Sequence, residues 1–309
     1  MRNVEILGFG TSVPKNTVEF DGQIRYRSAD GETQLSLAVE ACNNAFKSAN
    51  LKITDIDLIV AASAVGIQPI PCTAALIHEV IARGTDIPAM DINTTCTSFV
   101  TALDTVSYFI EAGKYNRVLI VSSELASVGL NKDQKESYEL FSDSAAAVIV
   151  GKSDGSSGIL ASIQKTWSEG AHSTEIRGGL TNFVPGKYDG TNGKEYFFDM
   201  KGIQFLSLAG RKLPVIMDEF YKKNNLSLSD SDKIIPHQAS RALGMMMKRL
   251  EVPEDKYVDR VAEYGNMVSA SIPYTLCKCI EDGTVKKGDT VMLLGSAAGL
   301  TINVMVLKY

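Results

Sequence analysis

The sequence predicts an α/β fold in which two similar halves are joined in one chain of 309 residues. Short apolar strands alternate with helices along most of the chain, which is typical of sheets covered by helices on both faces. Segments of the second half also repeat segments of the first half in the same order. At 45% hydrophobic residues, a chain of this length can bury the core of two lobes.

The elements of the first half follow from local patterns. We predict strands over 4–8, 57–62, 88–93, 117–122 and 145–151, and helices over 34–49, 72–82 and 96–112. In the last of these helices, apolar residues recur at helical spacing at Phe99, Leu103, Val106 and Ile110, and Gly113 ends the helix.

Four segments of the first half recur in the second. The matched pairs are 51–60 with 226–235, 110–113 with 280–283, 118–123 with 291–296, and 144–150 with 296–302. The fourth pair has a smaller offset, because an extra stretch, 124–143, lies between the last two strands of the first half. We therefore predict a duplication, with one half over 1–155 and the other over 156–309. Residues 167–200, rich in Gly, Thr and Asn, are predicted to be a pocket-lining insert.

Composition excludes several classes of protein. The net charge of −5 and the pI of 5.4 give no sign of a nucleic-acid-binding surface. No apolar run reaches the ~18 residues that span a bilayer, and the N-terminus lacks the pattern of a signal peptide. The five cysteines have no disulfide-framework spacing. We expect a cytosolic protein, away from the membrane, with reduced thiols.

Cys96 is the first candidate for chemistry. It closely follows a predicted strand and begins a predicted helix, whose N-terminus carries partial positive charge. We therefore expect a thiol pKa below the usual ~8.5 and backbone N–H groups that can hold an oxyanion. Position alone leaves open the alternative of a buried cysteine that only packs.

His237 is the second candidate. It directly follows a predicted strand of the second half, at the position that matches Ala62, and strand ends of this kind open onto sites in α/β folds. Of the two other histidines, His78 lies within a predicted helix and His172 lies in the polar insert. A purely structural histidine is the alternative interpretation.

Asn266 is the third candidate, in a turn before a predicted helix. The repeat places it opposite the region 93–98, so we expect Asn266 and Cys96 near one pseudo-twofold axis. A carboxamide can donate to a carbonyl oxygen but cannot act as a base. The alternative is an asparagine that only stabilises its own turn. The small residues of 294–300 could bring further N–H groups close to a ligand.

Together these motifs resemble the ketoacyl synthase III group of the thiolase superfamily over 4–309. The stretches that carry the resemblance are Asp91-Ile-Asn-Thr-Thr-Cys96-Thr-Ser-Phe99, Pro236-His237-Gln-Ala-Ser240, Tyr264-Gly265-Asn266, and Phe141-Ser-Asp143-Ser-Ala-Ala, where the family has glycine at both serines. The resemblance implies a thiolase-like fold with five layers in the order αβαβα.

The resemblance also implies a mechanism. Cys96 would take an acyl group from an acyl-CoA or acyl-ACP, where ACP is the acyl carrier protein. His237 and Asn266 would then hydrogen-bond the thioester carbonyl of malonyl-ACP or malonyl-CoA and stabilise the enolate formed as carbon dioxide leaves. The carbanion would attack the acyl-Cys96 thioester, with the oxyanion held by the N–H groups of Cys96 and Ala298.

Further residues are implied by similarity. Ile70, Phe141 and Ser296 would line the substrate pocket, Ile70 at a position that limits the acyl pocket of the partner subunit in a homodimer. Because the carrier protein is acidic, a basic patch is expected from Arg241, Lys248 and Arg249. No metal or bound cofactor is implied.

Two departures weaken the case for an acetyl-priming enzyme and give equal weight to a specialised paralogue in fatty-acid or secondary metabolism. Residues 295–299 read Gly-Ser-Ala-Ala-Gly where the fatty-acid-initiating enzymes usually have a glycine triplet, and 14–32 is shorter than in those enzymes. Arg25 and Arg27 in this short stretch would contact the coenzyme A adenine or face solvent.

Two other hypotheses remain. An acyltransferase of the same fold would move the acyl group from Cys96 to an oxygen or nitrogen nucleophile, but Asn266 speaks against it because such enzymes tend to have an acid there. A non-catalytic scaffold subunit is disfavoured because cysteine, histidine and asparagine are all retained.

Overall fold

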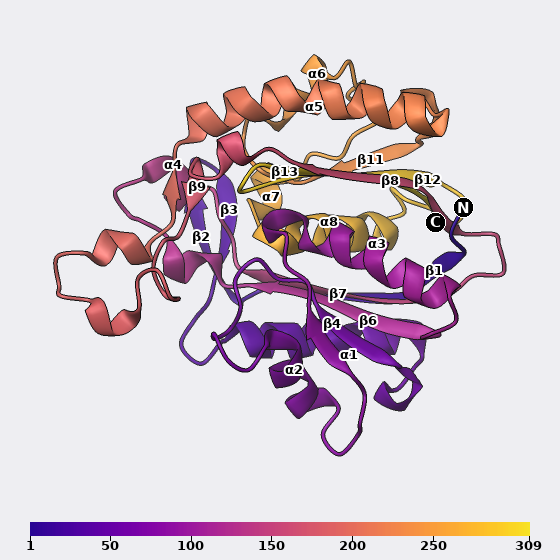
Figure 1. The fold of residues 1–309 in the computed structure, drawn as a ribbon, viewed down its shortest axis with the longest axis horizontal. Helices are drawn as coiled ribbons and strands as arrows, with labels where there is room; N and C mark the ends of the chain where they lie inside the picture. Colours follow the sequence, from indigo (N-terminus) through magenta and orange to yellow (C-terminus); the bar gives the residue numbers. More distant parts are fainter.

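The computed structural model describes residues 1–309 as five layers, in the order helix, sheet, helix, sheet, helix (Figure 1). The strands are β1 (Val4–Ser12), β2 (Asn16–Phe20), β3 (Gln23–Arg27), β4 (Leu58–Ala61), β5 (Ala89–Asp91), β6 (Arg117–Glu124), β7 (Ser144–Lys152), β8 (Gly158–Thr166), β9 (Thr174–Glu175), β10 (Asp199–Met200), β11 (Lys233–Pro236), β12 (Thr290–Ala297) and β13 (Thr301–Lys308). The helices are α1 (Gln34–Ala49), α2 (Thr73–Ile81), α3 (Ser98–Glu111), α4 (Lys135–Tyr138), α5 (Gly202–Asn224), α6 (Leu243–Arg249), α7 (Val261–Tyr264) and α8 (Ser271–Glu281).

The two large sheets have matching topology. The first has the strand order β1-β7-β6-β4-β5, and the second, given from its other edge, has the order β8-β13-β12-β11. In each sheet the first two pairings are antiparallel and the third is parallel. Helices α3 and α8 lie between the sheets, while α1 and α2 cover one outer face and α5 and α6 cover the other (Figure 1). The αβαβα arrangement is therefore confirmed.

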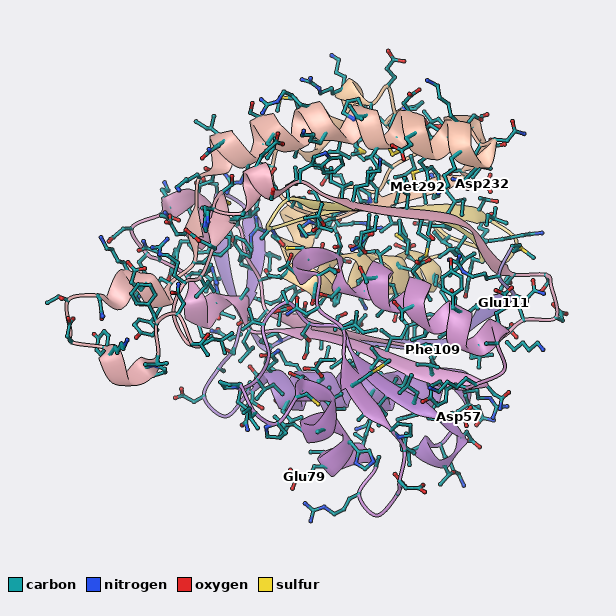
Figure 2. All side chains as sticks on the ribbon, viewed as in Figure 1. Asp57, Glu79, Phe109, Glu111, Asp232 and Met292 are labelled. Carbon is teal, nitrogen blue, oxygen red and sulfur yellow. The ribbon has the colours of Figure 1, made fainter.

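A pair of aspartates makes the same contacts in both sheets. The carboxylate of Asp57 accepts the N–H of Arg117 at 2.9 Å, and the N–H of Asp57 donates to the Arg117 carbonyl at 2.9 Å. Asp232 makes both bonds with Thr290, each at 2.8 Å. Figure 2 labels Asp57 at the lower right of the molecule and Asp232 at the upper right. These repeated contacts support our proposal that 1–155 and 156–309 are duplicated halves.

One of the four sequence matches is wrong. It set 144–150 against 296–302, but the strand order makes Thr301–Lys308 the counterpart of β7. Ser296 and Ala297 instead end β12, the counterpart of β6. Stretches of Ser and Ala in both places produced the match through composition.

Three apolar clusters hold the layers together. The central one joins both sheets through side chains of α3 and α8, such as Val106 and Leu276. A second packs α5 and α6 on the outer face of the second sheet and includes Met292, labelled in Figure 2. The third packs α1 and α2 on the first sheet. None of the helices combines the length and the apolar content needed to span a bilayer.

Helix α1 lies unusually close to β1. A Cβ atom on Gly8 would come within 2.5 Å of the Cβ of Ala49, and one on Gly10 would come within 2.4 Å of the Ala41 carbonyl oxygen. These contacts are with backbone or with short side chains that cannot turn away, so both positions require glycine.

We predict that Gly10→Ala lowers the free energy of unfolding by about 1–3 kcal/mol, because the added methyl group forces α1 off the sheet. Gly186→Ala is the matched control, since a Cβ there has nothing within 4 Å. Urea unfolding followed by circular dichroism measures both. Equal stability of the two variants would contradict the close packing of α1 on β1.

Candidate active site

Cys96 lies in the 3-10 turn η2 (Thr95–Thr97), directly before α3. Thr95 has φ +53°, a left-handed conformation that costs a β-branched residue about 1–3 kcal/mol. The turn is held by hydrogen bonds from the Thr95 N–H to Asn93 Oδ1 at 2.8 Å and from Ser98 Oγ to the Thr95 carbonyl at 2.7 Å. The helix therefore begins at Ser98, not at Cys96 as predicted, and the sulfur lies ahead of it.

The second half contains the same turn. In η8 (Val268–Ala270), directly before α8, Val268 has φ +52° and donates its N–H to Asn266 Oδ1 at 2.8 Å. Asn266 is thus the counterpart of Asn93, and Ser269 is the counterpart of Cys96. The element that precedes this turn is the short helix α7.

His237 directly follows β11. Its Nδ1 lies 2.9 Å from the Ser296 carbonyl oxygen, and its Nε2 lies 3.1 Å from Asn266 Oδ1. The Asn266 amide is oriented by donation from Nδ2 to the Ala239 carbonyl at 3.2 Å. Both ring nitrogens thus face oxygen acceptors, which favours a protonated ring. Burial has the larger effect and lowers the pKa of His237, so the imidazole is neutral at neutral pH.

The electrostatics of Cys96 differ from the prediction. Burial, and after it the nearby Glu124 carboxylate, raise the pKa of the Cys96 thiol to about 12. Hydrogen bonds from the N–H groups of Ala298 and of Cys96 itself to the sulfur lower the pKa by less. The predicted low pKa is therefore wrong, because the thiol is removed from water and faces a carboxylate.

Glu124 is a site residue that sequence reasoning missed. It ends β6, it is 2% exposed, and it lines the same cavity as Cys96. In the sequence it is a single acidic residue after an apolar strand, and such a residue gives no signal that distinguishes it from a surface position.

One cavity of about 1600 Å³ contains Cys96, His237 and Asn266 in its lining. Phe141, Ser296 and Ala298 also line it, as predicted. Its other apolar lining includes Leu130, Ile176, Phe198, Met200, Leu206, Leu213, Met246 and Met247. This space exceeds the ~300–1000 Å³ of most small-molecule sites, and it can hold a long thioester substrate. No group of three or more His, Cys, Asp or Glu side chains forms a metal site.

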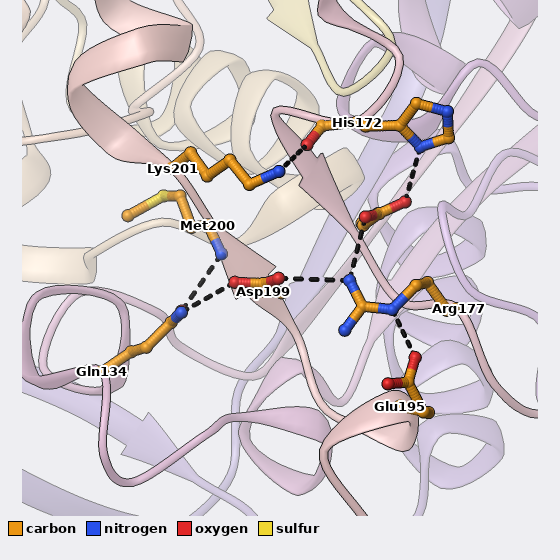
Figure 3. A network of polar contacts seen from close by, with 8 residues as sticks. Gln134, His172, Arg177, Glu195, Asp199, Met200 and Lys201 are labelled. Atoms are coloured by element: carbon orange, nitrogen blue, oxygen red, sulfur yellow. Dashed lines mark hydrogen bonds and ion pairs between the residues drawn. The ribbon is translucent and has the colours of Figure 1, made fainter. Parts of the chain in front are cut away.

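The polar insert lines this cavity, as predicted, through residues that include Ile176, Phe198 and Met200. Figure 3 shows the network that holds it. The Arg177 guanidinium bonds to the carboxylates of Glu175, Glu195 and Asp199, and Asp199 also accepts from Gln134 Nε2 at 2.8 Å. The network ties the insert to the loop before α4.

The predicted basic patch is divided. Arg241 lies in the cavity lining and is exposed, so it is on the rim of the cavity. Lys248 and Arg249 are exposed at the end of α6 and do not line the cavity. Ile70 is 85% exposed and also lies outside the cavity of its own chain.

The expectation for Arg25 and Arg27 is wrong. Arg25 is fully buried, and its guanidinium donates to the carbonyls of Glu139 and Ala262. Arg27 is buried too and donates to the Tyr138 carbonyl at 2.5 Å. Both arginines hold the chain together and neither is open to a ligand.

A five-layered αβαβα fold, with a cysteine, a histidine and an asparagine on one cavity, defines a protein of the thiolase superfamily. Residues 90–167 match the family model 3-oxoacyl-[acyl-carrier-protein (ACP)] synthase III, and residues 221–309 match its C-terminal model. The chain is 33% identical to the beta-ketoacyl-[acyl-carrier-protein] synthase III of Clostridium perfringens, over 100% of both chains. The chain belongs to the beta-ketoacyl-[acyl-carrier-protein] synthase III family.

Solved structures agree with this assignment. The crystal structure of 3-oxoacyl-[acyl-carrier-protein] synthase III from Aquifex aeolicus has a TM-score of 0.88 and 27% identity, covering 99% of this chain and 100% of that one. OleA of Xanthomonas campestris, with a TM-score of 0.86, 18% identity and coverage of 99% and 98%, shares the fold.

We predict that iodoacetamide at pH 7.5 modifies the exposed Cys72 before Cys96, because burial disfavours the Cys96 thiolate. The rate at Cys96 should rise about tenfold per pH unit between pH 8 and 10. Peptide mass spectrometry measures both sites, with Cys96→Ser as the control. Rapid modification of Cys96 at pH 6 would contradict the raised thiol pKa.

Proposed function

We propose that the protein is a decarboxylative condensing enzyme that joins an acyl group, carried on Cys96, to a malonyl thioester. The observation that carries the proposal is the set of partners around His237, which are a backbone carbonyl and the Asn266 carboxamide. A histidine that serves a hydrolase or a simple acyltransferase is usually oriented by a carboxylate. This arrangement suits the stabilisation of an enolate better than the activation of an oxygen or nitrogen nucleophile.

In the first step, Cys96 Sγ attacks the carbonyl of an acyl-CoA or acyl-ACP. The S–C bond to Cys96 forms, the bond to the donor sulfur breaks, and the thiol proton passes to the departing thiolate. Because the thiol pKa is high, the proton has to leave as the S–C bond forms, and it is taken up by the departing thiolate.

In the second step, the malonyl thioester loses carbon dioxide. The electron pair of the breaking C–C bond moves into the thioester carbonyl as an enolate, which the second N–H of Asn266 Nδ2 and the N–H of His237 stabilise. The enolate carbon then attacks the acyl-Cys96 carbonyl. The N–H groups of Cys96 and Ala298, which already contact the sulfur, would hold that oxyanion until the C–S bond breaks, after which the Cys96 thiolate takes up a proton from water.

We also propose a homodimer in which Ile70 of each subunit enters the cavity of the other. Its side chain is 85% exposed in the single chain, and an apolar side chain this exposed is suited to a partner's pocket. The β5 edge of the first sheet has only one strand neighbour and is available for pairing. A specialised acyl donor, an ACP substrate and a cytosolic location remain predictions.

We expect the wild-type protein to gain the mass of an acyl group from a thioester donor and then to release carbon dioxide from malonyl-ACP. Asn266→Ala should still be acylated, but its carbon dioxide release should fall about 10²–10³-fold, because one enolate donor is lost. Carbon dioxide release by His237→Ala should fall similarly. The matched control is His172→Ala, because His172 is an exposed histidine of the insert. Intact mass spectrometry and trapping of labelled carbon dioxide are the measurements.

Transfer of the acyl group to an alcohol or amine without carbon dioxide release would support the acyltransferase hypothesis instead. Cys96→Ser should lose the acyl adduct and the condensation product.

We predict that Arg241→Glu raises KM for carrier-bound substrate about tenfold, because the acidic carrier protein meets a reversed charge at the rim. KM for the corresponding CoA thioester should change less. Lys248→Glu, a similar change away from the cavity, should have a smaller effect. If both variants keep the wild-type KM for malonyl-ACP, neither residue binds the carrier protein.

A further inference from the structure

Glu124 is a buried carboxylate that the proposed reaction does not use. Its oxygens accept the N–H of Ala64 at 2.5 Å and the hydroxyl of Ser269, and the N–H groups of Val65 and Ser269 also point to it. Burial raises the pKa of Glu124 to about 7 despite these donors. A carboxylate is costly to bury, so one that lines a catalytic cavity and collects four neutral donors needs an explanation.

From one side, hydrogen bonds lead from Glu124 to the nucleophile. The Glu124 carboxylate accepts a hydrogen bond from the N–H of Ala64, and the carbonyl of Ala64 accepts one from Asn93 Nδ2 at 2.8 Å. Asn93 Oδ1 in turn accepts the N–H of Thr95 at 2.8 Å, which fixes the left-handed residue directly before Cys96.

From the other side, hydrogen bonds lead to the histidine and the asparagine. Glu124 holds both the hydroxyl and the N–H of Ser269. Ser269 follows Val268, whose N–H binds Asn266 Oδ1 at 2.8 Å, and the same oxygen lies 3.1 Å from His237 Nε2. One carboxylate therefore connects the two matching turns, which come from different halves of the chain.

We propose that Glu124 is a positioning residue that fixes the turn of Cys96 relative to the turn of Asn266 and places a carboxylate beside the Cys96 sulfur. The inference rests on the proposed function, because the distance between these turns matters only if an enolate formed at one attacks an acyl group held at the other. The donors around Glu124 come from the 64–65 segment and from η8 and are neutral, so Cys96, on η2, is the titratable group on which its charge acts.

Glu124→Gln in a Cys72→Ser background tests the proposal. The amide has nearly the same shape but no charge, and its NH₂ group meets N–H donors, so the link between the turns weakens. We compare the pH dependence of the Cys96 alkylation rate between pH 8 and 10, where Glu124 is ionised in the wild type. In Glu124→Gln this pH dependence should move to lower pH by about one unit. Carbon dioxide release should fall at least about tenfold. A faster-reacting thiol with slower condensation is a combination that a merely structural role would not produce.

Asp143→Asn is the matched control, because Asp143 is also fully buried and also collects N–H and hydroxyl donors, but it does not line the cavity. In this variant the pH dependence of Cys96 alkylation should match that of the wild type. A second variant, Ser269→Ala, removes only the hydroxyl that links Glu124 to the second turn. It should slow carbon dioxide release about fivefold and leave the protein folded.

Two results would overturn the inference. One is that Glu124→Gln alkylates Cys96 with the pH dependence of the wild type and that its turnover is either unchanged or reduced only as much as the amount of folded protein is reduced. The other is that Ser269→Ala releases carbon dioxide at the wild-type rate, and this result tests the inference even when Glu124→Gln does not fold. If the wild type itself releases no carbon dioxide, the proposed function fails, and the alkylation profile still tests the effect of Glu124 on Cys96.

Discussion

Two strained turns, one in each half, determine how this active site is built. Thr95 and Val268 both have left-handed backbones that β-branched residues rarely adopt, and each donates its N–H to an asparagine two residues earlier. The rigid sheets and the central helices α3 and α8 sustain this cost by fixing both ends of each turn. Because the halves face each other across α3 and α8, the turns meet at one cavity.

The duplicated turn has diverged in its chemistry. In the first half it presents the sulfur of Cys96, and in the second half the corresponding residue is Ser269, whose hydroxyl binds Glu124. The asparagines have diverged as well. Asn93 bonds to the backbone of Thr95 and Ala64, whereas Asn266 also contacts the His237 side chain and lines the cavity. A symmetric scaffold thus carries an asymmetric site, with the nucleophile on one side and the carbonyl-binding groups on the other.

Much of this arrangement could be predicted from the sequence. The repeats and the αβα pattern led to the fold, and the places of Cys96, His237 and Asn266 next to matched segments led to a shared cavity. Electrostatics could not be predicted, because the pKa of Cys96 depends on burial and on Glu124, a residue distant in sequence. The prediction for Arg25 was wrong for a related reason. Its charge indicated a surface position, but backbone carbonyls from three segments surround the guanidinium. The effect of Ile70 on an acyl pocket depends on a second subunit.

The central claim is that His237 and Asn266 bind the thioester oxygen of the malonyl group while Cys96 holds the acyl chain. A crystal structure of the acylated protein with an unreactive malonyl thioester analogue tests it most directly. We expect the thioester oxygen within ~2.6–3.2 Å of both His237 Nε2 and Asn266 Nδ2. An analogue whose thioester oxygen binds elsewhere, with His237 and Asn266 still joined to each other, would contradict the proposed chemistry.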